Sequence, residues 1–371
     1  MAAQSNQGGM LSIRIAKRLS KSFALAAEFE APPGFTMLLG PSGSGKTTLL
    51  NCIAGLARPD AGTIALNGRV LFDSSSRINL PVQQRKLGYL FQNLALFPHL
   101  TIAENVEYGI SKLPNAERIE RAAAALESFR IAHLTARKPH EISGGERQRA
   151  ALARALVTNP AMLLLDEPLL ALDLATKAKI VDDLRTWNAE HAVPIVYVTH
   201  APEEAYALGE RVVVLDNGRV VARGRPNEVL KAPRHETVAQ IVGFENVFDA
   251  TVQSTSETQG TMLCRLDRSS AEIDVPLGHA AIGDRIRIAI RAGDIIVATE
   301  PPTHLSARNR LAARIVAIRR EGSRVILTIE AGVEFEVHVT PRASDELELI
   351  NGRQVWLVIK SYSCHLVAQS E

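Results

Sequence analysis

Apolar residues in the first two thirds of the chain form short continuous runs separated by longer stretches with helical spacing. Between Ile13 and about Val242, the runs Phe35–Leu39, Met162–Leu165 and Ile195–Thr199 are the clearest. Short apolar runs of this kind are typical of strands that are buried on both faces. Their alternation with helical patterns predicts a mostly parallel α/β sheet.

One stretch in this region, Arg211–Gly224, predicts a hairpin instead. Its first apolar run, Val212–Leu215, is separated from Val220 and Val221 by the dipeptide Asn217-Gly218. Asn-Gly is a favoured two-residue hairpin turn, because both residues tolerate a positive φ. We therefore expect an antiparallel edge of the sheet at this point.

Two segments rich in Ala and Leu, Glu117–Phe129 and Gln148–Thr158, have the spacing and composition of helices. Together they predict a helical subdomain over about residues 93–160. After Gly243 the apolar period changes to two, which predicts strands with one buried face. The alternation is clearest at Ile286, Ile288 and Ile290 and at Val333, Phe335, Val337 and Val339. The chain is thus divided into an α/β domain (1–243) and an all-β domain (244–371).

The β domain contains an internal similarity. Asn246–Val252 resembles Asn309–Ile315, and Ile290–Ala292 occupies the place in the first copy that Ile359–Ser361 occupies in the second. This similarity predicts two tandem modules, the second spanning about 304–371. The alternative is a chance likeness between amphipathic strands, whose individual patterns are weak.

Composition narrows the possible partners and the compartment. The 371 residues are 46% hydrophobic and 22% charged, with a net charge of +2, which gives no reason to expect nucleic acid as a partner. The three cysteines, Cys52, Cys264 and Cys364, form no CxxC pair, so neither a zinc site nor a disulfide framework is indicated. No apolar run is long enough to span a bilayer, and no signal-peptide pattern is present.

A glycine-rich motif lies between a predicted strand and the helical segment Lys46–Ala54. Its backbone N–H groups can surround phosphate oxygens, the lysine can neutralise them, and the final threonine hydroxyl can bind Mg²⁺. A glycine-rich turn beside a surface lysine is the alternative, which the flanking strand and helix disfavour. The motif G-x-x-x-x-G-K-[ST] is matched by Gly40, Pro41, Ser42, Gly43, Ser44, Gly45, Lys46 and Thr47.

Candidate catalytic residues follow two of the predicted strands. Asp166 and Glu167 end the run that begins at Met162, where one carboxylate can hold Mg²⁺ and the other can polarise a water molecule. His200 follows the strand that ends at Thr199. Acidic residues or a histidine after a strand are often only solvated, and the phosphate-binding motif upstream is what favours the catalytic interpretation.

The segment Ile142-Ser143-Gly144-Gly145-Glu146 resembles the signature sequence of ABC ATPases, and residues from Ile13 to Gly243 resemble that family throughout. Ser143 and Glu146 also fit a capping box that begins the following helix, and both interpretations are compatible. A capped helix start exposes N–H groups to a phosphate. The resemblance therefore predicts an ABC-type P-loop fold with a helical subdomain, followed by an OB-like all-β regulatory domain.

The resemblance also assigns roles to individual residues. It implies that Gln92, in the Q-loop, and Thr47 and Asp166 bind Mg²⁺, that Thr48 contacts ATP, and that His200 contacts the γ-phosphate. Phe23 is the aromatic placed to stack on adenine, although an aromatic near a strand is more often part of a core. Asp173 matches the D-loop, although Leu170 and Ala171 stand where small polar residues are commoner. Two copies would sandwich two ATP molecules, each signature segment and Asp173 acting on the nucleotide of the other copy.

A second motif lies in the later β module and resembles that of molybdate-binding modules. Hydroxyl, ammonium and backbone N–H groups can donate hydrogen bonds to a tetrahedral dianion. The alternative is a surface turn with incidental charges. The first module has Arg291-Ala292 in place of Lys360-Ser361 and lacks a serine equivalent to Ser306, so we treat it as structural. The predicted oxyanion residues are Ser306, Ala307, Arg308, Asn309, Lys360 and Ser361.

These resemblances imply the ATPase subunit of a molybdate importer. It would lie peripherally on the cytoplasmic face of the inner membrane, with transmembrane permease subunits and an external solute-binding protein as partners. Molybdate or tungstate would be its regulatory ligand and ATP with Mg²⁺ its cofactors. The alternatives are an importer for tungstate, sulfate, a sugar, a polyamine or iron, a soluble ABC ATPase acting on DNA or the ribosome, and an oxyanion-storage or sensor protein.

Overall fold

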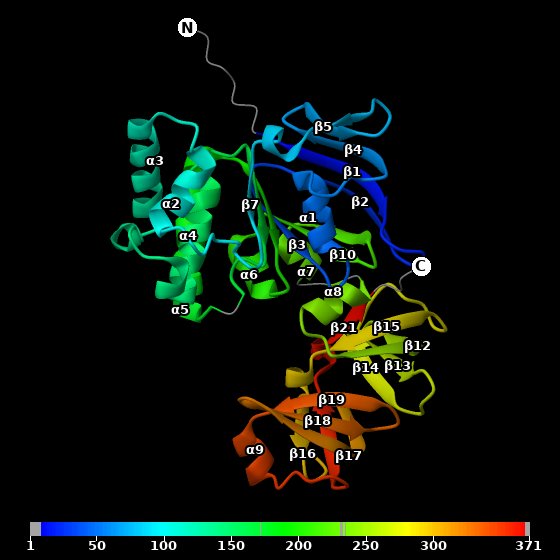
Figure 1. The fold of residues 1–371 in the computed structure, drawn as a ribbon. Helices are drawn as coiled ribbons and strands as arrows, with labels where there is room; N and C mark the ends of the chain where they lie inside the picture. The colour runs from blue at the N-terminus through cyan, green and yellow to red at the C-terminus, as the bar shows by residue number, and fades with distance from the viewer. Residues whose placement is uncertain (1–8, 171, 231–232, 234, 368–371) are drawn as a thin grey trace. The chain divides into compact units, whose positions relative to one another are not determined.

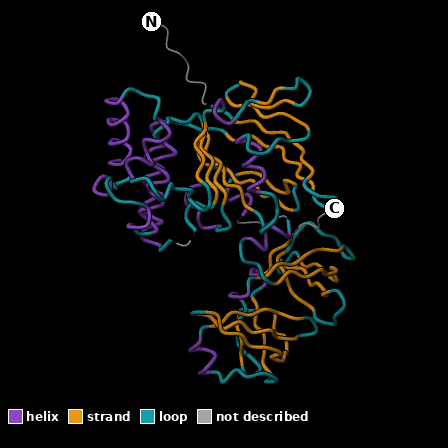
Figure 2. Tube along the Cα trace, viewed as in Figure 1, coloured by secondary structure: helices purple, strands orange, loops and turns teal. Residues whose placement is uncertain are grey.

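The computed structural model describes residues 9–170, 172–230, 233 and 235–367. The chain divides into two compact units, Met1–Val229 and Leu230–Glu371, which are described separately here (Figures 1 and 2). The described residues between 230 and 243, which the sequence grouped with the α/β domain, belong to the second unit. There Ala239 of α8 (Glu236–Ile241) shares a small apolar cluster with Phe244, Ala289 and Val367. No helix among the described residues is long and apolar enough to cross a membrane.

The first unit is built on one eleven-stranded sheet with two halves. One half is parallel, with β7, β8, β9, β3 and β10 side by side, and its central strands β3, β8 and β9 are buried along their whole length. In pairing order the strands are β6 (Ile78–Asn79), β5 (Arg69–Asp73), β4 (Ala61–Leu66), β1 (Leu11–Arg18), β2 (Ala24–Ala31), β11 (Arg219–Gly224), β10 (Arg211–Asp216), β3 (Gly34–Leu39), β9 (Pro194–Val198), β8 (Met162–Asp166) and β7 (Leu87–Leu90).

Two expectations about this sheet were wrong. The sheet is mixed rather than mostly parallel, because β1, β2, β4, β5 and β6 pair antiparallel. The predicted hairpin at Arg211–Gly224 is confirmed, with Asn217 and Gly218 at φ 44° and 77°. It does not form an edge, because β10 pairs with β3 on one side and β11 meets β2 at Arg219 on the other, joining the two halves.

Helices cover the sheet and form the predicted helical subdomain. The helix expected at Lys46–Ala54 is α1 with the same bounds, and the helices expected at Glu117–Phe129 and Gln148–Thr158 are α3 and α4. The helices of this unit are α1 (Lys46–Ala54), α2 (Ile102–Glu107), α3 (Asn115–Ser128), α4 (Gly144–Leu156), α5 (Leu174–His191), α6 (Pro202–Leu208) and α7 (Pro226–Leu230), the last ending at the boundary. Short 3₁₀ turns occupy Val82–Gln84, Tyr108–Ile110, Ala132–Leu134 and Pro139–Glu141.

A buried arginine holds the end of α1 that is opposite the phosphate motif. The guanidinium of Arg85, 1% exposed, donates hydrogen bonds to the carbonyl oxygens of Cys52 (2.9 Å) and Ile53 (2.7 Å). A cation at the carboxyl end of a helix satisfies carbonyls that have no partner in the helix and complements the helix dipole. Gly55 follows with φ 82°, and a Cβ there would come within 2.7 Å of Arg85 Nε, so glycine is required.

The second unit contains two five-stranded sheets with the same strand order. The first sheet is β14 (Glu272–Pro276), β13 (Thr261–Leu266), β12 (Asn246–Ser256), β15 (Arg285–Ile290) and β21 (Cys364–Val367). The second is β19 (Glu334–Val339), β18 (Arg324–Glu330), β17 (Asn309–Glu321), β20 (Gln354–Ile359) and β16 (Ile296–Ala298). The remaining elements are α9 (Pro341–Glu346) and the 3₁₀ turns η5 (Ala292–Asp294) and η6 (Ser361–Ser363).

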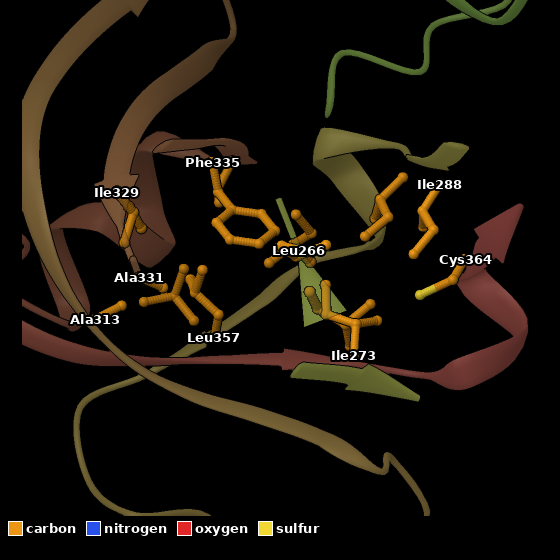
Figure 3. Close-up of a cluster of buried hydrophobic side chains, with 14 of the residues drawn as sticks. Leu266, Ile273, Ile288, Ala313, Ile329, Ala331, Phe335, Leu357 and Cys364 are labelled. Carbon is orange, nitrogen blue, oxygen red and sulfur yellow. The ribbon is translucent and has the colours of Figure 1, made fainter. Parts of the chain in front are cut away.

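The two modules exchange their fifth strands. β16 follows the first module in the chain but pairs with β20 of the second, and β21 follows the second module but pairs with β15 of the first. A single apolar core runs through both sheets, including Leu266 and Ile288 from one and Phe335 and Leu357 from the other (Figure 3). The two modules follow one another in the chain and are interlocked through β16 and β21.

Two buried asparagines at equivalent positions fasten each module to the other. Asn309, at the start of β17, accepts a hydrogen bond from Asp274 N (2.6 Å) and donates one to Asp274 O (2.9 Å) on β14. Asn246, at the start of β12, does the same with Glu336 N (2.7 Å) and O (2.8 Å) on β19. A side-chain amide that satisfies both backbone groups of one residue acts as an additional strand partner.

We expect Asn309→Ala to lower the free energy of unfolding of the second unit by about 2 kcal/mol or more, because Asp274 loses partners for two partly buried backbone groups. Trp356 on β20 is the only tryptophan of this unit, so denaturant unfolding followed by fluorescence in a Trp187→Phe background reports on it. Asn351→Ala, at an exposed turn, is the matched control. Equal midpoints of denaturant unfolding for Asn309→Ala and the control would refute the proposed role of the Asn309 amide in holding β14.

Candidate functional site

The predicted phosphate motif and the predicted catalytic residues meet at one end of the parallel half-sheet. In the register of the sheet Leu90 lies opposite Leu165, Asp166 opposite Val198 and Leu38 opposite Val198, so β7, β8, β9 and β3 end together. Ligand sites of α/β sheets form at the carboxyl ends of the strands. A cleft of about 650 Å³ opens there, lined by Leu19, Phe23, Gly40, Ser42, Gly43, Gly45, Lys46, Thr47, Thr48, Gln92, Glu167, Leu170 and His200.

The turn between β3 and α1 has a backbone that only glycine accommodates at two points. Gly40 has φ 154°, and a Cβ there would lie 2.1 Å from Leu215 O. Gly45, with φ 103°, immediately precedes α1, so the first turn of the helix begins at the cleft. The ring of Phe23 reaches within 3.5 Å of where a Gly45 Cβ would stand. Exposed N–H groups and the positive end of α1 make this turn suited to an anion.

The charged groups of the turn are held close together. Lys46 Nζ donates to Gly40 O (2.8 Å) and Pro41 O (2.7 Å), and burial lowers its pKa while Glu167 and Asp166 act in the opposite direction. Burial raises the pKa of Asp166, against the effects of a hydrogen bond with Thr47 and of the Lys46 charge. A desolvated cation and a desolvated carboxylate at one anion-receptive turn are typical of a functional site.

Glu167 stands at the centre of the predicted catalytic residues. Its backbone is left-handed, with φ 49°, directly after β8. Gln92 Nε2 donates to Glu167 Oε2 (3.0 Å), and His200 Nδ1 lies 3.6 Å from Glu167 Oε1. A strained backbone of this kind persists only where the surroundings hold it, and it directs the carboxylate into the cleft. Glu167 can accept a proton from, or orient, a water molecule beside a bound phosphate.

Oxygen ligands suited to Mg²⁺ are available in the same cleft. Thr47 and Gln92 line the cleft, Asp166 ends β8 beside Thr47, and Gln92 donates to Glu167 through its amide nitrogen, so its carbonyl oxygen is not used in that bond. Mg²⁺ prefers such hard oxygen ligands and takes the rest from phosphate and water. The part of the chain described here contains no group of three or more His, Cys, Asp or Glu residues that could hold a metal by themselves.

The signature segment lies outside this cleft. Ser143 caps α4, accepting from Glu146 N (3.4 Å), while Glu146 Oε2 accepts from Ser143 N and Ser143 Oγ (both 2.8 Å). The capping box expected from the sequence is therefore present, and it lowers the pKa of Glu146. Asp173 caps α5 and also stands away from the cleft; Ala171 lies outside the described residues.

The predicted oxyanion residues fall into two groups. Asn309 and Ser361 are buried and engaged within the protein: Asn309 holds β14, and Ser361 Oγ donates to Asp274 Oδ1 (2.6 Å). Ala307 is also buried. Ser306, Arg308 and Lys360 are exposed, and their side chains have no hydrogen bond or ion pair with any described residue. Ser306, Arg308 and Lys360 are therefore the predicted residues whose side chains are available to a ligand.

The equivalent place in the first module carries a carboxylate. Glu245, in the position of Arg308, accepts a hydrogen bond from Ala292 N (2.8 Å), and His338 Nδ1 lies 4.0 Å from its other oxygen. Because Glu245 already supplies a negative charge to this position, an external oxyanion would be repelled there. This explains in physical terms why the first module lacks the motif of the second.

Several residues that matter to the site gave no signal in the sequence. Leu19 lines the cleft, Asp274 accepts from Ser361, and buried Glu204 forms an ion pair with the partly exposed Lys177 close to His200 in the chain. These residues come from elements distant in sequence and belong to no motif. Only the tertiary contacts reveal them.

Comparison with known proteins agrees with both halves of the chain. Residues 27–170 match the ABC transporter family, and residues 305–366 match the TOBE domain. The molybdenum import ATP-binding protein ModC of Paramagnetospirillum magneticum is 38% identical over 95% of this chain and 97% of its own length. That of Mesorhizobium japonicum is 41% identical over 92% of each.

Two further relatives extend the comparison. The molybdate/tungstate import ATP-binding protein WtpC of Pyrococcus horikoshii is 36% identical, over 89% of this chain and 91% of its own. The dimeric structure of MJ0796, a bacterial ABC transporter cassette, matches with a TM-score of 0.51 and 31% identity, covering 58% of this chain and 98% of the cassette.

We expect Glu167→Gln to lower the rate of ATP hydrolysis by about 100-fold or more while ATP binding is retained, because the amide keeps the shape but cannot act as a base. Phosphate release and equilibrium binding of a fluorescent ATP analogue measure the two effects separately. Glu203→Gln, on the exposed face of α6, should leave both unchanged. Hydrolysis within a few-fold of wild type in Glu167→Gln would refute the catalytic assignment.

Proposed function

This chain belongs to the family of molybdenum import ATP-binding proteins of ABC transporters, and we propose that it hydrolyses ATP to drive import of molybdate through separate permease subunits. The observation that carries the proposal is the convergence of Lys46, Gln92, Glu167 and His200 on one cleft, in a chain that matches molybdenum import relatives over nearly its whole length. Tungstate is the second candidate solute, because a relative named for both oxyanions matches over most of the chain.

Each residue of the cleft has a role in the proposed hydrolysis. The N–H groups of residues 42–47 and the Lys46 ammonium bind the β- and γ-phosphates, Thr48 adds a contact, and Phe23 stacks on the adenine. Glu167 orients and deprotonates the attacking water, and His200 contacts the γ-phosphate. Mg²⁺, held by Thr47, Gln92 and Asp166, would neutralise phosphate charge when bound.

Two copies of the chain are proposed to complete the site. Ser143, Gly144, Gly145, Glu146 and Asp173 lie outside the cleft of their own chain, which accords with a role at the nucleotide of a second copy. The matched cassette structure is itself described as dimeric. Closure of the pair around ATP would exclude water from the phosphates and align the α4 helix starts with them.

An exposed aromatic groove beside the Q-loop is the proposed contact with the permease. It holds about 340 Å³ and is lined by Tyr89, Phe91, Phe97, Tyr108 and Arg154, among others. Tyr108 is 58% exposed, and its ring packs against Phe97 with centroids 4.5 Å apart. Large exposed aromatics in a groove are typical of a protein interface.

The groove is mechanically linked to the catalytic residues. Arg154 of α4 donates to Leu94 O and Ala95 O (both 2.7 Å), two residues with left-handed backbones just after Gln92. A helix of the permease seated here would therefore bear on the loop that positions Gln92 against Glu167. The chain would lie at the cytoplasmic face of the inner membrane through this contact, with an external solute-binding protein acting from the other side.

We expect Tyr108→Ala to reduce the stimulation of ATP hydrolysis by the permease subunits by about tenfold or more, and to leave the activity of the isolated chain unchanged. The reason is that an aromatic anchor buried at an interface contributes about 2 kcal/mol or more to the binding free energy. Hydrolysis with and without the permease subunits measures this ratio. Ile119→Ala, an exposed apolar residue on α3, is the control. Full stimulation of Tyr108→Ala would exclude the groove as the docking site.

The β unit is proposed to sense the internal oxyanion. Arg308, Lys360 and Ser306 can donate to a tetrahedral dianion between the β units of two copies, while Asn309, Ser361 and Ala307 shape the turn that presents them. A site away from the transport route can regulate by binding one arrangement of the dimer more tightly than another. The proposal is feedback inhibition of ATP hydrolysis by accumulated molybdate or tungstate.

We expect molybdate to inhibit ATP hydrolysis by the assembled transporter and Lys360→Ala to raise the inhibitory concentration by about tenfold, since a charge-assisted hydrogen bond contributes about 1.5–3 kcal/mol. Arg319→Ala, an exposed cation on β17, should behave as wild type. No response in wild type beyond that of Lys360→Ala would exclude feedback, and stronger inhibition by sulfate would overturn the choice of molybdate.

A further inference from the structure

A buried carboxylate follows His200 by four residues and does not line the cleft. Glu204, on the first turn of α6, is 8% exposed. Its Oε2 accepts hydrogen bonds from Thr199 Oγ1 (2.7 Å) and Tyr197 Oη (3.0 Å), and its Oε1 lies 3.4 Å from Lys177 Nζ. A charge is buried only where several donors compensate it. None of the proposed catalytic roles accounts for this arrangement.

The first of these donors controls the backbone that carries His200. Thr199 Oγ1 donates to Glu204 and accepts from Ala201 N (3.0 Å), so one hydroxyl bridges the residues on either side of His200. The histidine side chain is 59% exposed, and its contact with Glu167 is a distant 3.6 Å. Its position therefore depends on the turn 199–201, which Glu204 holds through Thr199.

The third donor comes from the start of α5. Lys177 N donates to Asp173 O (2.9 Å), and the Asp173 carboxylate caps the same turn through Thr176 N (2.9 Å) and Thr176 Oγ1 (2.7 Å). The methyl group of Thr176 lies against Gly145, where an added Cβ would approach to 2.7 Å. The first turn of α5 thus touches the signature segment on one side and Glu204 on the other.

We propose that Glu204 is a positioning residue that ties the turn holding His200 to the first turn of α5, so that the rate of hydrolysis depends on how the segment at Asp173 is seated. Polar contacts run from Asp173 through Lys177 to Glu204, and from there through Thr199 to Ala201, which fixes the turn that carries His200 beside Glu167. Glu204 acts through the placement of His200 and makes no contact with ATP. A displacement of Asp173 by a second copy would reach His200 along this path.

The proposal differs from a purely structural role in what it predicts for kinetics. A residue that only stabilises the fold alters the amount of active protein, whereas a residue that positions His200 alters kcat at constant KM. Residues in one network also show non-additive effects, which a double-mutant cycle measures. Lys177, whose side chain is 27% exposed, can be replaced with little risk to folding.

The experiment measures kcat and KM for ATP in full-length Glu204→Gln, Lys177→Met and the double variant. We expect kcat to fall by about tenfold in each, with KM within about twofold of wild type and no further loss in the double variant. Thr199→Ser, which keeps the hydroxyl, should retain wild-type kcat, and Thr199→Val should match Glu204→Gln. Lys179→Met, an exposed lysine on α5, is the matched control.

A cycle with His200→Ala tests whether Glu204 acts through the histidine. In that background, single-turnover hydrolysis should be unaffected by Glu204→Gln. Multiplicative losses in either cycle, or a wild-type kcat in Lys177→Met, would overturn the proposal. So would a fall in active-site concentration, measured by ATP binding, that accounts for all of the loss in Glu204→Gln.

Discussion

The whole catalytic arrangement depends on the parallel register of four strands. β7, β8, β9 and β3 pair so that Leu90, Asp166, Val198 and Leu39 reach the same edge of the sheet. The loops that follow these strands carry Gln92, Glu167, His200 and the phosphate turn, four segments far apart in the chain. A shift by one residue in any of these pairs would move the loop that follows the strand by about 3.3 Å along the strand direction, and would separate Gln92, Glu167 or His200 from the others.

The same edge brings groups of opposite charge into a partly dry environment. Asp166 and Lys46 are both buried. Burial raises the pKa of Asp166 and lowers the pKa of Lys46, which favours the neutral form of each, and the opposite charge of the other residue acts against both shifts. Glu204 and Lys177 form a further pair of opposite charge, which Thr199 connects to the turn that carries His200. Tyr197, whose pKa is raised by burial and by Glu204, stays a hydrogen-bond donor at any physiological pH. These compensated charges keep the cleft polar without exposing the core to water.

Local signals in the sequence were sufficient for much of this. The helix Lys46–Ala54, the turn at Asn217-Gly218 and the capping box of Ser143 and Glu146 depend on residues within a few positions of one another, and all three are present. Long-range arrangement was harder to predict. Nothing in Arg211–Gly224 indicates that its strands join two half-sheets. The strand Ala24–Ala31 was not among the clear apolar runs, because two of its four buried residues are alanines.

The candidate oxyanion site shows the same limit. The sequence motif groups Ser306, Arg308, Asn309, Lys360 and Ser361 as equals, because a motif contains no information on burial. The structure separates three exposed donors from Asn309 and Ser361, whose side chains bind Asp274 on β14. Their partner Asp274 comes from the first module, and no local pattern connects that module to the second.

The exchange of β16 and β21 also determines which segments of this unit could fold when separated from the rest. The TOBE match covers residues 305–366, yet a segment cut at 305 would lack the strand that completes its own sheet and would carry away the strand that completes the other. Neither half contains every strand of its own sheet, so we expect neither to form its complete sheet without the other. The strand β21, only four residues long, completes a sheet whose other strands, β12 to β15, precede the whole second module in the chain, so the first module can be completed only after the second has been synthesised.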